Sequence, residues 1–337
     1  MLALPILLLL AGCGGEPATP TWRFALEEIE GSVQDVFARR FALEIQERTD
    51  GSVDVVIYPY GSLGTSAQLT EQVQQGALQL AFASPGHLGS VVPEAQVFSL
   101  HFVFSDDEEV NGRAVAAGGP VQRILDEAYR DRGLALLAVV PEGWMVWTGD
   151  RELRSPADFR GFKMRTMASP LLVEAYRAYG ASPTPLPYAE VYGALQLGMV
   201  DGQVNPIFAI EEMSFYEVQD VMTFAHHLPF VTTLVANPTF LDGLAPELRK
   251  TLEDVIRELE VEIAGVQQEM NRERLERIQA AGGTRLVELS EAERQTFRDA
   301  SLPVRDRYRE LAGERGAEVL RTLQTEVRRL ESERDAG

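Results

Sequence analysis

The sequence predicts an α/β protein with two units of alternating strands and helices, followed by a largely helical C-terminal part. Three observations lead to this prediction. Short β-branched runs alternate with amphipathic segments before Pro141, a second such series follows Gly143, and apolar residues recur at helical spacing beyond Leu241. The length of 337 residues fits about two domains of ~150 residues each.

The first unit begins with a strand and continues with helices and strands in alternation. Apolar side chains at helical spacing predict the helices, and short β-branched or wholly apolar runs predict the strands. The apolar run at 134–140 is typical of a buried parallel strand. The expected order is a strand at 22–29, a helix at 32–48, a strand at 53–58, a helix at 66–75, a strand at 78–83, a helix at 121–131 and a strand at 134–140.

The second unit and the C-terminal part follow the same reasoning. Apolar residues from Leu248 to Ile278 step by three to five, which predicts one long amphipathic helix ending at Gly282. Mixed charge on its flanks indicates a helix that packs across a domain rather than a helix of a coiled coil. The other expected elements are a strand at 145–148, a short helix from 156, a strand at 163–166, helices at 170–179 and 189–197, and a charged helical tail at 290–333.

The charge balance and the absent motifs exclude several classes of function. Acidic residues (51) outnumber basic ones (31), giving a formal net charge of -20, which repels nucleic acid phosphates and anionic lipid headgroups. The sequence contains no HExxH, CxxC, GxSxG or phosphate-loop motif. His226 and His227 are neighbours, and on one strand they would point to opposite faces. We therefore expect no enzyme activity, no catalytic residues, no metal site and no cofactor.

The first residues resemble a bacterial lipoprotein signal. An apolar run at 1–10 leads into Leu10-Ala11-Gly12-Cys13, and Cys13 is the only cysteine. The run is shorter than the ~20 apolar residues of a transmembrane helix. We expect a signal peptide at 1–12, a tether at 13–21 and lipidation of Cys13, with an incidental thiol as the alternative. The mature chain would then be extracytoplasmic, touching the membrane only through its lipid.

Four motifs in the second unit indicate a family. They are DFRGFKMRT at 158–166, GASPTPLPYAEVYGALQ at 180–196, DGQVNP at 201–206 and FYEV at 215–218. Together they resemble the solute-binding proteins of tripartite ATP-independent periplasmic (TRAP) transporters, the DctP-like family. YPYGSLG at 58–64 and VFSLHFVFSD at 97–106 extend the resemblance over nearly the whole mature chain.

The resemblance implies a two-lobed periplasmic solute-binding protein with a hinged cleft and a long helix spanning both lobes. By this resemblance, 22–142 with 231–270 form lobe I, and 143–230 with 271–337 form lobe II. Ligand contacts from both lobes favour closure of such a cleft.

The resemblance also implies which side chains bind the ligand. Arg165 matches the family's carboxylate-binding arginine, and its guanidinium offers a planar fork of donors that pairs bidentately with a carboxylate. Asn205, in the DGQVNP turn, matches a residue that donates its amide N–H to the same carboxylate. Tyr188 falls where the family places an aromatic ring against the ligand.

Further contacts are expected from positions where the family varies. Relatives that bind dicarboxylates or sugar acids have a second arginine near Trp144 and Trp147, and its absence here favours a flat apolar wall formed by Trp144, although either indole can belong to the core. Glu27 or Glu28, at the end of the first strand, and Ser84, after the strand at 80–83, are expected to add polar contacts.

The expected function is capture of a small organic acid and its delivery to the small and large membrane subunits of a TRAP transporter. Because the whole protein is strongly acidic, recognition of an acid must come from a buried arginine and local dipoles rather than from long-range steering. Two alternatives remain at this point, a sensory lipoprotein that presents ligand to a membrane signalling partner and an extracytoplasmic enzyme on the same scaffold.

Overall fold

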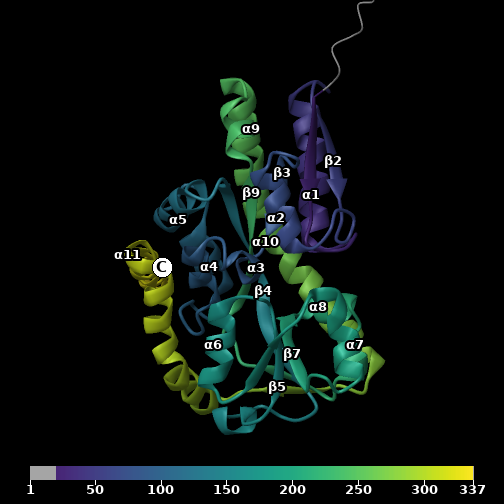
Figure 1. Cartoon of the computed structure of the whole chain (residues 1–337), viewed down its shortest axis with the longest axis vertical. Helices are drawn as coiled ribbons and strands as arrows, with labels where there is room; N and C mark the ends of the chain where they lie inside the picture. The colour runs from purple at the N-terminus through teal and green to yellow at the C-terminus, as the bar shows by residue number, and fades with distance from the viewer. Residues whose placement is uncertain (1–19, 337) are drawn as a thin grey trace, which may run out of the picture.

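The computed structural model describes residues 20–336 and shows two α/β lobes, one above the other (Figure 1). In the upper lobe, lobe I, the sheet order is β2-β1-β3-β9-β4. β1 is parallel to β2 and β3, whereas β9 runs antiparallel to β3 and β4. The strands are β1 Thr21–Ala25, β2 Asp54–Tyr58, β3 Leu80–Ala83, β4 Ala135–Gly149 and β9 Pro229–Ala236.

Helices of lobe I pack on the two faces of this sheet and bury two apolar clusters. Ser32 caps the first helix, because its hydroxyl accepts from the backbone N–H of Asp35 at 3.1 Å, a contact worth ~1 kcal/mol. This cap fixes the connection that follows β1. The helices are α1 Val33–Arg48, α2 Ser66–Gln74, α3 Pro85–Leu88, η1 Pro93–Ser99, α4 Glu108–Val115, α5 Pro120–Arg130 and α9 Pro238–Asp242.

Lobe II is built around the second half of β4, which pairs antiparallel with β7 and β8. β5 lies between β7 and β6, and β10 adds to β8. The strands are β5 Lys163–Thr166, β6 Ser182–Pro185, β7 Gly202–Pro206, β8 Val221–Phe224 and β10 Arg285–Glu288. The helices are η2 Pro156–Phe159, α6 Pro170–Ala178, η3 Tyr188–Glu190, α7 Val191–Gln196, α8 Ile207–Glu212 and η4 Phe215–Val218.

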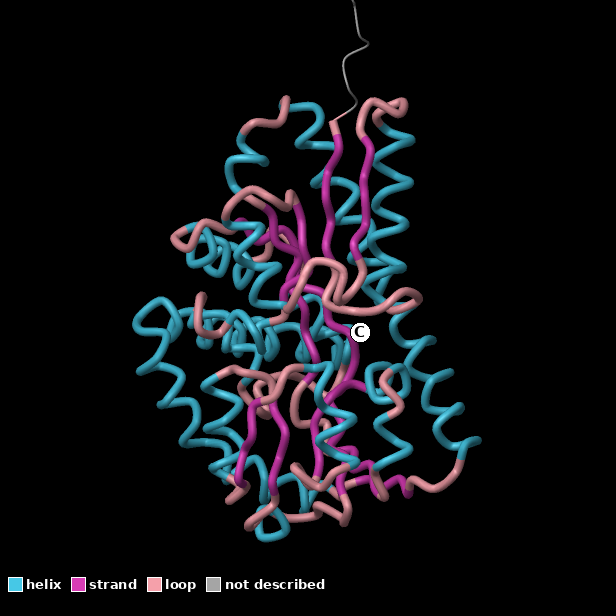
Figure 2. The backbone as a smooth tube through the Cα atoms, turned by 45° about the vertical axis from the view of Figure 1, so that its right-hand side comes forward, coloured by secondary structure: helices cyan, strands magenta, loops and turns pink. Residues whose placement is uncertain are grey.

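Among residues 20–336, the segments that pass from one lobe to the other include β4, the passage from β8 into β9, and α10 Pro246–Ala281. Figure 2 shows strands passing through the middle of the molecule from one lobe to the other. Helix α10 contacts α1 in lobe I and α8 in lobe II. The predicted long helix, its end at Gly282 and its span over both lobes are confirmed.

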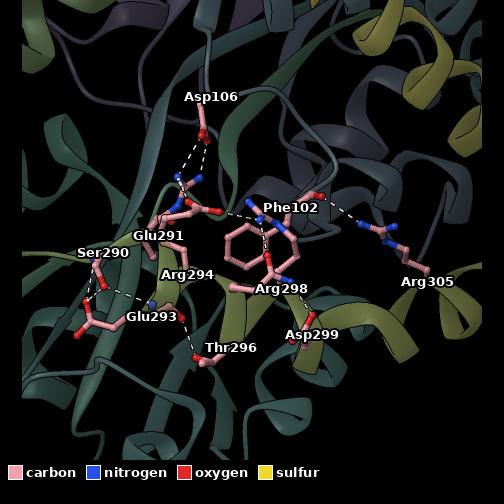
Figure 3. A network of polar contacts seen from close by, with 12 residues as sticks. Phe102, Asp106, Ser290, Glu291, Glu293, Arg294, Thr296, Arg298, Asp299 and Arg305 are labelled. Carbon is pink, nitrogen blue, oxygen red and sulfur yellow. Dashed lines mark hydrogen bonds and ion pairs between the residues drawn. The ribbon is translucent and has the colours of Figure 1, made fainter.

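The last helical segment, α11 Glu291–Ala336, also runs along both lobes (Figure 1), and it is kinked at Gly313, whose φ of 64° is not helical. Phe297 packs in the lobe II core, whereas Val304, Tyr308 and later apolar residues join the lobe I cluster with α4 and α5. Where the helix crosses, Arg294 pairs with Asp106 and Arg298 lies over the Phe102 ring (Figure 3). We propose to divide 271–337 between the lobes rather than assign the whole segment to lobe II.

The structure corrects several strand predictions. The run at 134–140 pairs antiparallel with β9, not parallel with a neighbour. It continues through Pro141 as one strand, and a register shift at Pro141/Gly143 marks the place where this strand passes into lobe II. Asn205 and Pro206 belong to strand β7 rather than to a turn. The first strand ends at Ala25 instead of 29, and His226 and His227 lie in the β8–β9 connection, with His226 at a positive φ of 46°.

Candidate ligand-binding cleft

A narrow cleft lies between the lobes. Its walls come from the segments after β1 and β3 in lobe I, from β5, β7 and α8 in lobe II, and from β9 at the crossing. The lining residues are Glu27, Glu28, Gln34, Tyr60, Ser66, Ser84, His87, Arg165, Met167, Tyr188, Asn205, Pro206, Phe208, Ala209 and Phe230.

Arg165 is the central basic group of the cleft. It lies in β5, is fully buried, and donates from Nε and Nη2 to the carbonyl oxygen of Leu186 at 3.1 and 2.8 Å. Among residues 20–336, Nη1 has no hydrogen-bond partner and no carboxylate pairs with the guanidinium. Burial lowers the pKa of Arg165 to about 10, so the group stays charged at neutral pH. A buried cation without a counter-ion is costly unless an anion joins it.

Asn205 shares the sheet face of Arg165. β5 and β7 are parallel with Arg165 opposite Gln203, so Asn205, two residues further along β7, projects to the same side. Its amide is buried and donates to Oε1 of Gln203. The structure therefore brings Arg165 and Asn205 to the same cleft, as the sequence predicted. Their contact with a ligand stays a prediction.

Lobe I supplies an acidic wall opposite Arg165. The carboxylate of Glu27 accepts from the backbone N–H of Ser84 at 2.6 Å through Oε2, while its Oε1 is buried without a hydrogen-bond partner among the described residues. The backbone N–H of Glu27 donates to Oε1 of Gln34 at 2.9 Å. Ser84 thus positions Glu27 through its main chain, and Glu28 also lines the cleft.

Two tyrosines face each other across the cleft. The rings of Tyr60 in lobe I and Tyr188 in lobe II form an edge-to-face pair with centroids 5.7 Å apart. The hydroxyl of Tyr188 donates to the carbonyl oxygen of Ala209 at 3.4 Å, and burial holds its pKa well above the usual range. Tyr188 is therefore a neutral aromatic wall.

The tryptophans do not form the expected wall. Trp147 is fully buried in the lobe II core, and its indole N–H lies 3.0 Å from the Tyr176 hydroxyl oxygen and 3.1 Å from Nε2 of His227. Trp144 stacks on His226, with centroids 5.1 Å apart and planes 10° apart, and does not line the cleft. The apolar surface comes instead from Phe208, Phe230 and Met167.

Several lining residues were not expected from the sequence. Tyr60 lies within the YPYGSLG motif, so that motif could have indicated it. His87, whose pKa burial lowers, and Phe230 come from segments with no recognisable binding pattern. Within residues 20–336, no group of three His, Cys, Asp or Glu side chains is placed to hold a metal ion. No helix in that range is long and apolar enough to cross a membrane.

Two α/β lobes joined by crossing strands and a long helix, with a charged cleft between them, define a hinged solute-binding protein. The chain belongs to the DctP family, the bacterial extracellular solute-binding proteins of family 7, whose model matches residues 24–311. It is a transport protein rather than an enzyme, as the sequence predicted.

Named relatives agree with this assignment. The ectoine-binding periplasmic protein TeaA of Halomonas elongata is 37% identical over 96% of this chain and 95% of its own length. The ectoine/5-hydroxyectoine-binding periplasmic protein UehA of Ruegeria pomeroyi is 35% identical over 91% of this chain and 90% of its own. An apo, open TRAP solute-binding protein from Marinobacter aquaeolei is 48% identical, with a TM-score of 0.86 over 90% of this chain and 99% of its own.

Proposed function

We propose that this chain captures a small zwitterionic solute, which carries a carboxylate and a compact cationic group, and delivers it to the two membrane subunits of a TRAP transporter. The single observation that supports this most is the buried Arg165, whose Nη1 has no partner among the described residues. A ligand carboxylate would satisfy that donor and supply the missing counter-charge.

The acidic wall of lobe I favours a zwitterion over a simple acid. Glu27 Oε1 is a buried acceptor without a donor in the described part of the chain. A ligand N–H that carries positive charge would satisfy it with a charge-assisted hydrogen bond. Ectoine, which relatives are named for binding, is a zwitterion of this kind, a carboxylate on a cationic cyclic amidine. Dicarboxylates, by contrast, would bring a second negative charge towards Glu27.

The placement of these groups also supports ligand-driven closure. Arg165 and Asn205 lie in lobe II, and Glu27 lies in lobe I. A ligand that contacts both walls stabilises the state in which the lobes approach, because only that state makes all the contacts. The receptor alternative receives no support from the relatives.

The predicted localisation is proposed in two parts. Named relatives are periplasmic proteins, and we propose the same compartment here. Cys13 lies outside the described residues, and its lipidation is a separate proposal. Membrane fractionation of the wild type and of Cys13→Ser tests it, because only a lipidated chain loses its membrane association on this substitution.

Thermal unfolding of the mature chain against a ligand panel tests the function. The panel contains ectoine, other zwitterions, monocarboxylates, dicarboxylates and sugar acids. Ligand at ~100 times its Kd adds about 2.7 kcal/mol to the free energy of unfolding. We expect the largest shift with a zwitterion, and a shift confined to dicarboxylates or to uncharged compounds would contradict the proposal.

The Arg165→Ala variant tests the site within the same assay. Loss of a charge-assisted contact in a desolvated cleft costs more than ~3 kcal/mol of binding energy. Calorimetry should therefore show a loss in affinity above roughly 100-fold. Arg177→Ala, which removes an exposed arginine paired with Glu174, is the matched control and should bind as the wild type. An Arg165→Ala variant within threefold of the wild type would overturn the assignment.

A further inference from the structure

Two main-chain groups beside the cleft have no partner within their own secondary structure. The first is the carbonyl oxygen of Glu142 in β4, because the register shift between Pro141 and Gly143 leaves Glu142 unpaired in the ladder with β9. The second is the N–H of Phe208, the second residue of α8, since the first four N–H groups of a helix have no acceptor within it. Burying such a group is costly unless another part of the protein bonds it.

The side chain of Asn271 bonds both groups. Its Nδ2 donates to the carbonyl oxygen of Glu142 at 3.0 Å, and its Oδ1 accepts from the backbone N–H of Phe208 at 3.0 Å. Asn271 is buried and lies towards the C-terminal end of α10, which contacts α8 (Figure 1). One amide therefore joins three elements, namely α10, α8 and the part of β4 that passes between the lobes.

The two contacts require an amide at this position. Asparagine supplies a donor and an acceptor from one short side chain, whereas an ionised aspartate only accepts and alanine does neither. The neighbouring main chain leaves room for the amide, because an added Cβ at Gly143 would overlap Nδ2 of Asn271. The unpaired groups and the glycine thus agree on one side chain.

The corner between β7 and α8 is part of the cleft wall. The ladder between β7 and β4 fixes the first half of this corner. The first turn of α8 is bonded to Asn271 through Phe208, and the hydroxyl of Tyr188 donates to the carbonyl oxygen of Ala209. Four residues of the corner line the cleft, namely Asn205, Pro206, Phe208 and Ala209.

The other end of α8 has a separate attachment to α10. Arg274 pairs there with Glu211 and Glu212. These ion pairs hold the end of α8 that does not line the cleft, so they do not replace the bond to Phe208. The position of the cleft-facing turn relative to β4 therefore depends on Asn271.

We propose that Asn271 is a positioning residue for ligand binding, which holds the β7–α8 corner against the passage of β4 so that a ligand meets a preformed wall. This inference deepens the proposed function and rests on it. Without the amide, the first turn of α8 has to be ordered on binding, and that cost reduces affinity. Asn271 does not itself line the cleft, so it acts through Phe208 and not through contact with the ligand.

Amide hydrogen exchange tests the contact in the ligand-free protein. Selective ¹⁵N labelling of the 15 phenylalanines reports the Phe208 N–H by NMR, and Phe208→Leu assigns its signal. We expect slow exchange in the wild type and exchange faster by at least about tenfold in Asn271→Ala, because the acceptor is removed. In Asn271→Asp the exchange should stay slow, since a carboxylate still accepts from this N–H.

Gln267→Ala is the matched control. Gln267 is also a buried side-chain amide of α10, one turn before Asn271, and it too lies against Gly143. Its substitution removes a buried amide but keeps the bonds of Asn271 to Glu142 and Phe208. Exchange at Phe208 and ligand affinity should therefore be those of the wild type, even if the melting temperature falls.

Calorimetry with ectoine measures the effect on binding. We expect Asn271→Ala to bind roughly tenfold more weakly than the wild type, the size expected when a buried N–H loses its acceptor. Asn271→Asp should lose less, because it keeps one of the two hydrogen bonds. Affinity of Asn271→Ala within twofold of Gln267→Ala, or unchanged exchange at Phe208, would overturn the proposal.

Two further outcomes separate the parts of this argument. If Asn271→Ala does not fold, Asn271→Asp decides, because fast exchange at Phe208 in that variant contradicts the proposed contact and slow exchange supports it. If no ligand of the panel binds the wild type while the exchange results are as expected, the proposed function is wrong and the positioning of the wall by Asn271 stands.

Discussion

Glu27 is the residue whose substitution best distinguishes a zwitterion from a simple acid. Glu27→Gln keeps the hydrogen bond from Ser84 but removes the negative charge facing the cleft. We expect affinity for a zwitterion to fall by about 2 kcal/mol, the value of a hydrogen bond to a charged group, whereas affinity for a monocarboxylate is unchanged or improved. Calorimetry with both ligands measures the difference.

The matched control for that prediction is Glu30→Gln. Glu30 lies in the same connection, but it is an exposed carboxylate at 3.7 Å from Arg39 and does not line the cleft. Its substitution should leave both affinities unchanged, because exposed ion pairs contribute little. An equal loss of both ligands in Glu27→Gln would show that Glu27 supports the fold of the cleft rather than the cation.

Individual residues also show how far the sequence could predict this site. Arg165 and Asn205 could be predicted to line the cleft because each belongs to a short family motif, and such a motif indicates where its residues lie in the family's fold. Trp144 was misplaced because a strand's two faces cannot be assigned from sequence when both are apolar, and its ring stacks on His226 instead.

At the scale of elements, the most informative feature is β4, which serves both lobes. A Pro-Glu-Gly segment predicts a break, and the structure has a register shift there instead. Parallel or antiparallel pairing depends on which distant segment returns as the neighbour, and β9 lies far along the chain. The helices were predicted more closely, since their apolar periodicity is local and their caps, such as Ser32, mark the ends.

Gly143 in β4 provides a test of this passage between the lobes. Its φ of +105° disfavours any L side chain, and an added Cβ would lie 2.5 Å from Nδ2 of Asn271 and 2.7 Å from Nε2 of Gln267. Gly143→Ala should lower the free energy of unfolding by about 2–3 kcal/mol through backbone strain and overpacking against α10. Chemical denaturation measures this change.

A second glycine, on the helix that Gly143 packs against, should respond with the opposite sign. Gly265 lies inside α10, and an added Cβ there meets nothing within 4 Å. Gly265→Ala should raise the free energy of unfolding by roughly 0.5–1 kcal/mol through helix propensity. Two changes of the same sign would show that the substitutions act through the unfolded chain and not through the packing of β4 on α10.

At the scale of the whole molecule, buried titratable groups set the pH at which the fold is most stable. Glu28, Glu212 and Glu260 have pKa values raised from 4.5 to about 7, 8 and 7. The folded state therefore binds protons that the unfolded state releases above pH 4.5. Their contribution to stability is complete below that pH and is lost as the pH rises towards 8.

The buried histidines act in the opposite direction. His101 and His227 pack ring against ring, with centroids 4.7 Å apart, and burial lowers the pKa of His101 from 6.5 to about 3 and that of His227 well below its ordinary value. The unfolded state binds these protons first, so stability falls as the pH drops below 6.5. The two sets together leave a window of highest stability between about pH 4.5 and 6.5.

This window should be visible in the melting temperature. The net charge of -20 adds to the effect, because self-repulsion decreases as carboxylates are protonated. Calorimetric Tm measured from pH 4 to 9 should therefore peak in the mildly acidic range rather than near pH 7 to 8. In Glu28→Gln the decline on the alkaline side should be shallower, since one of the groups that lose protons is gone, while the acidic side stays unchanged. A Tm maximum above pH 7 in the wild type would mean that the buried carboxyls are ionised at neutral pH and that their protons do not stabilise the fold.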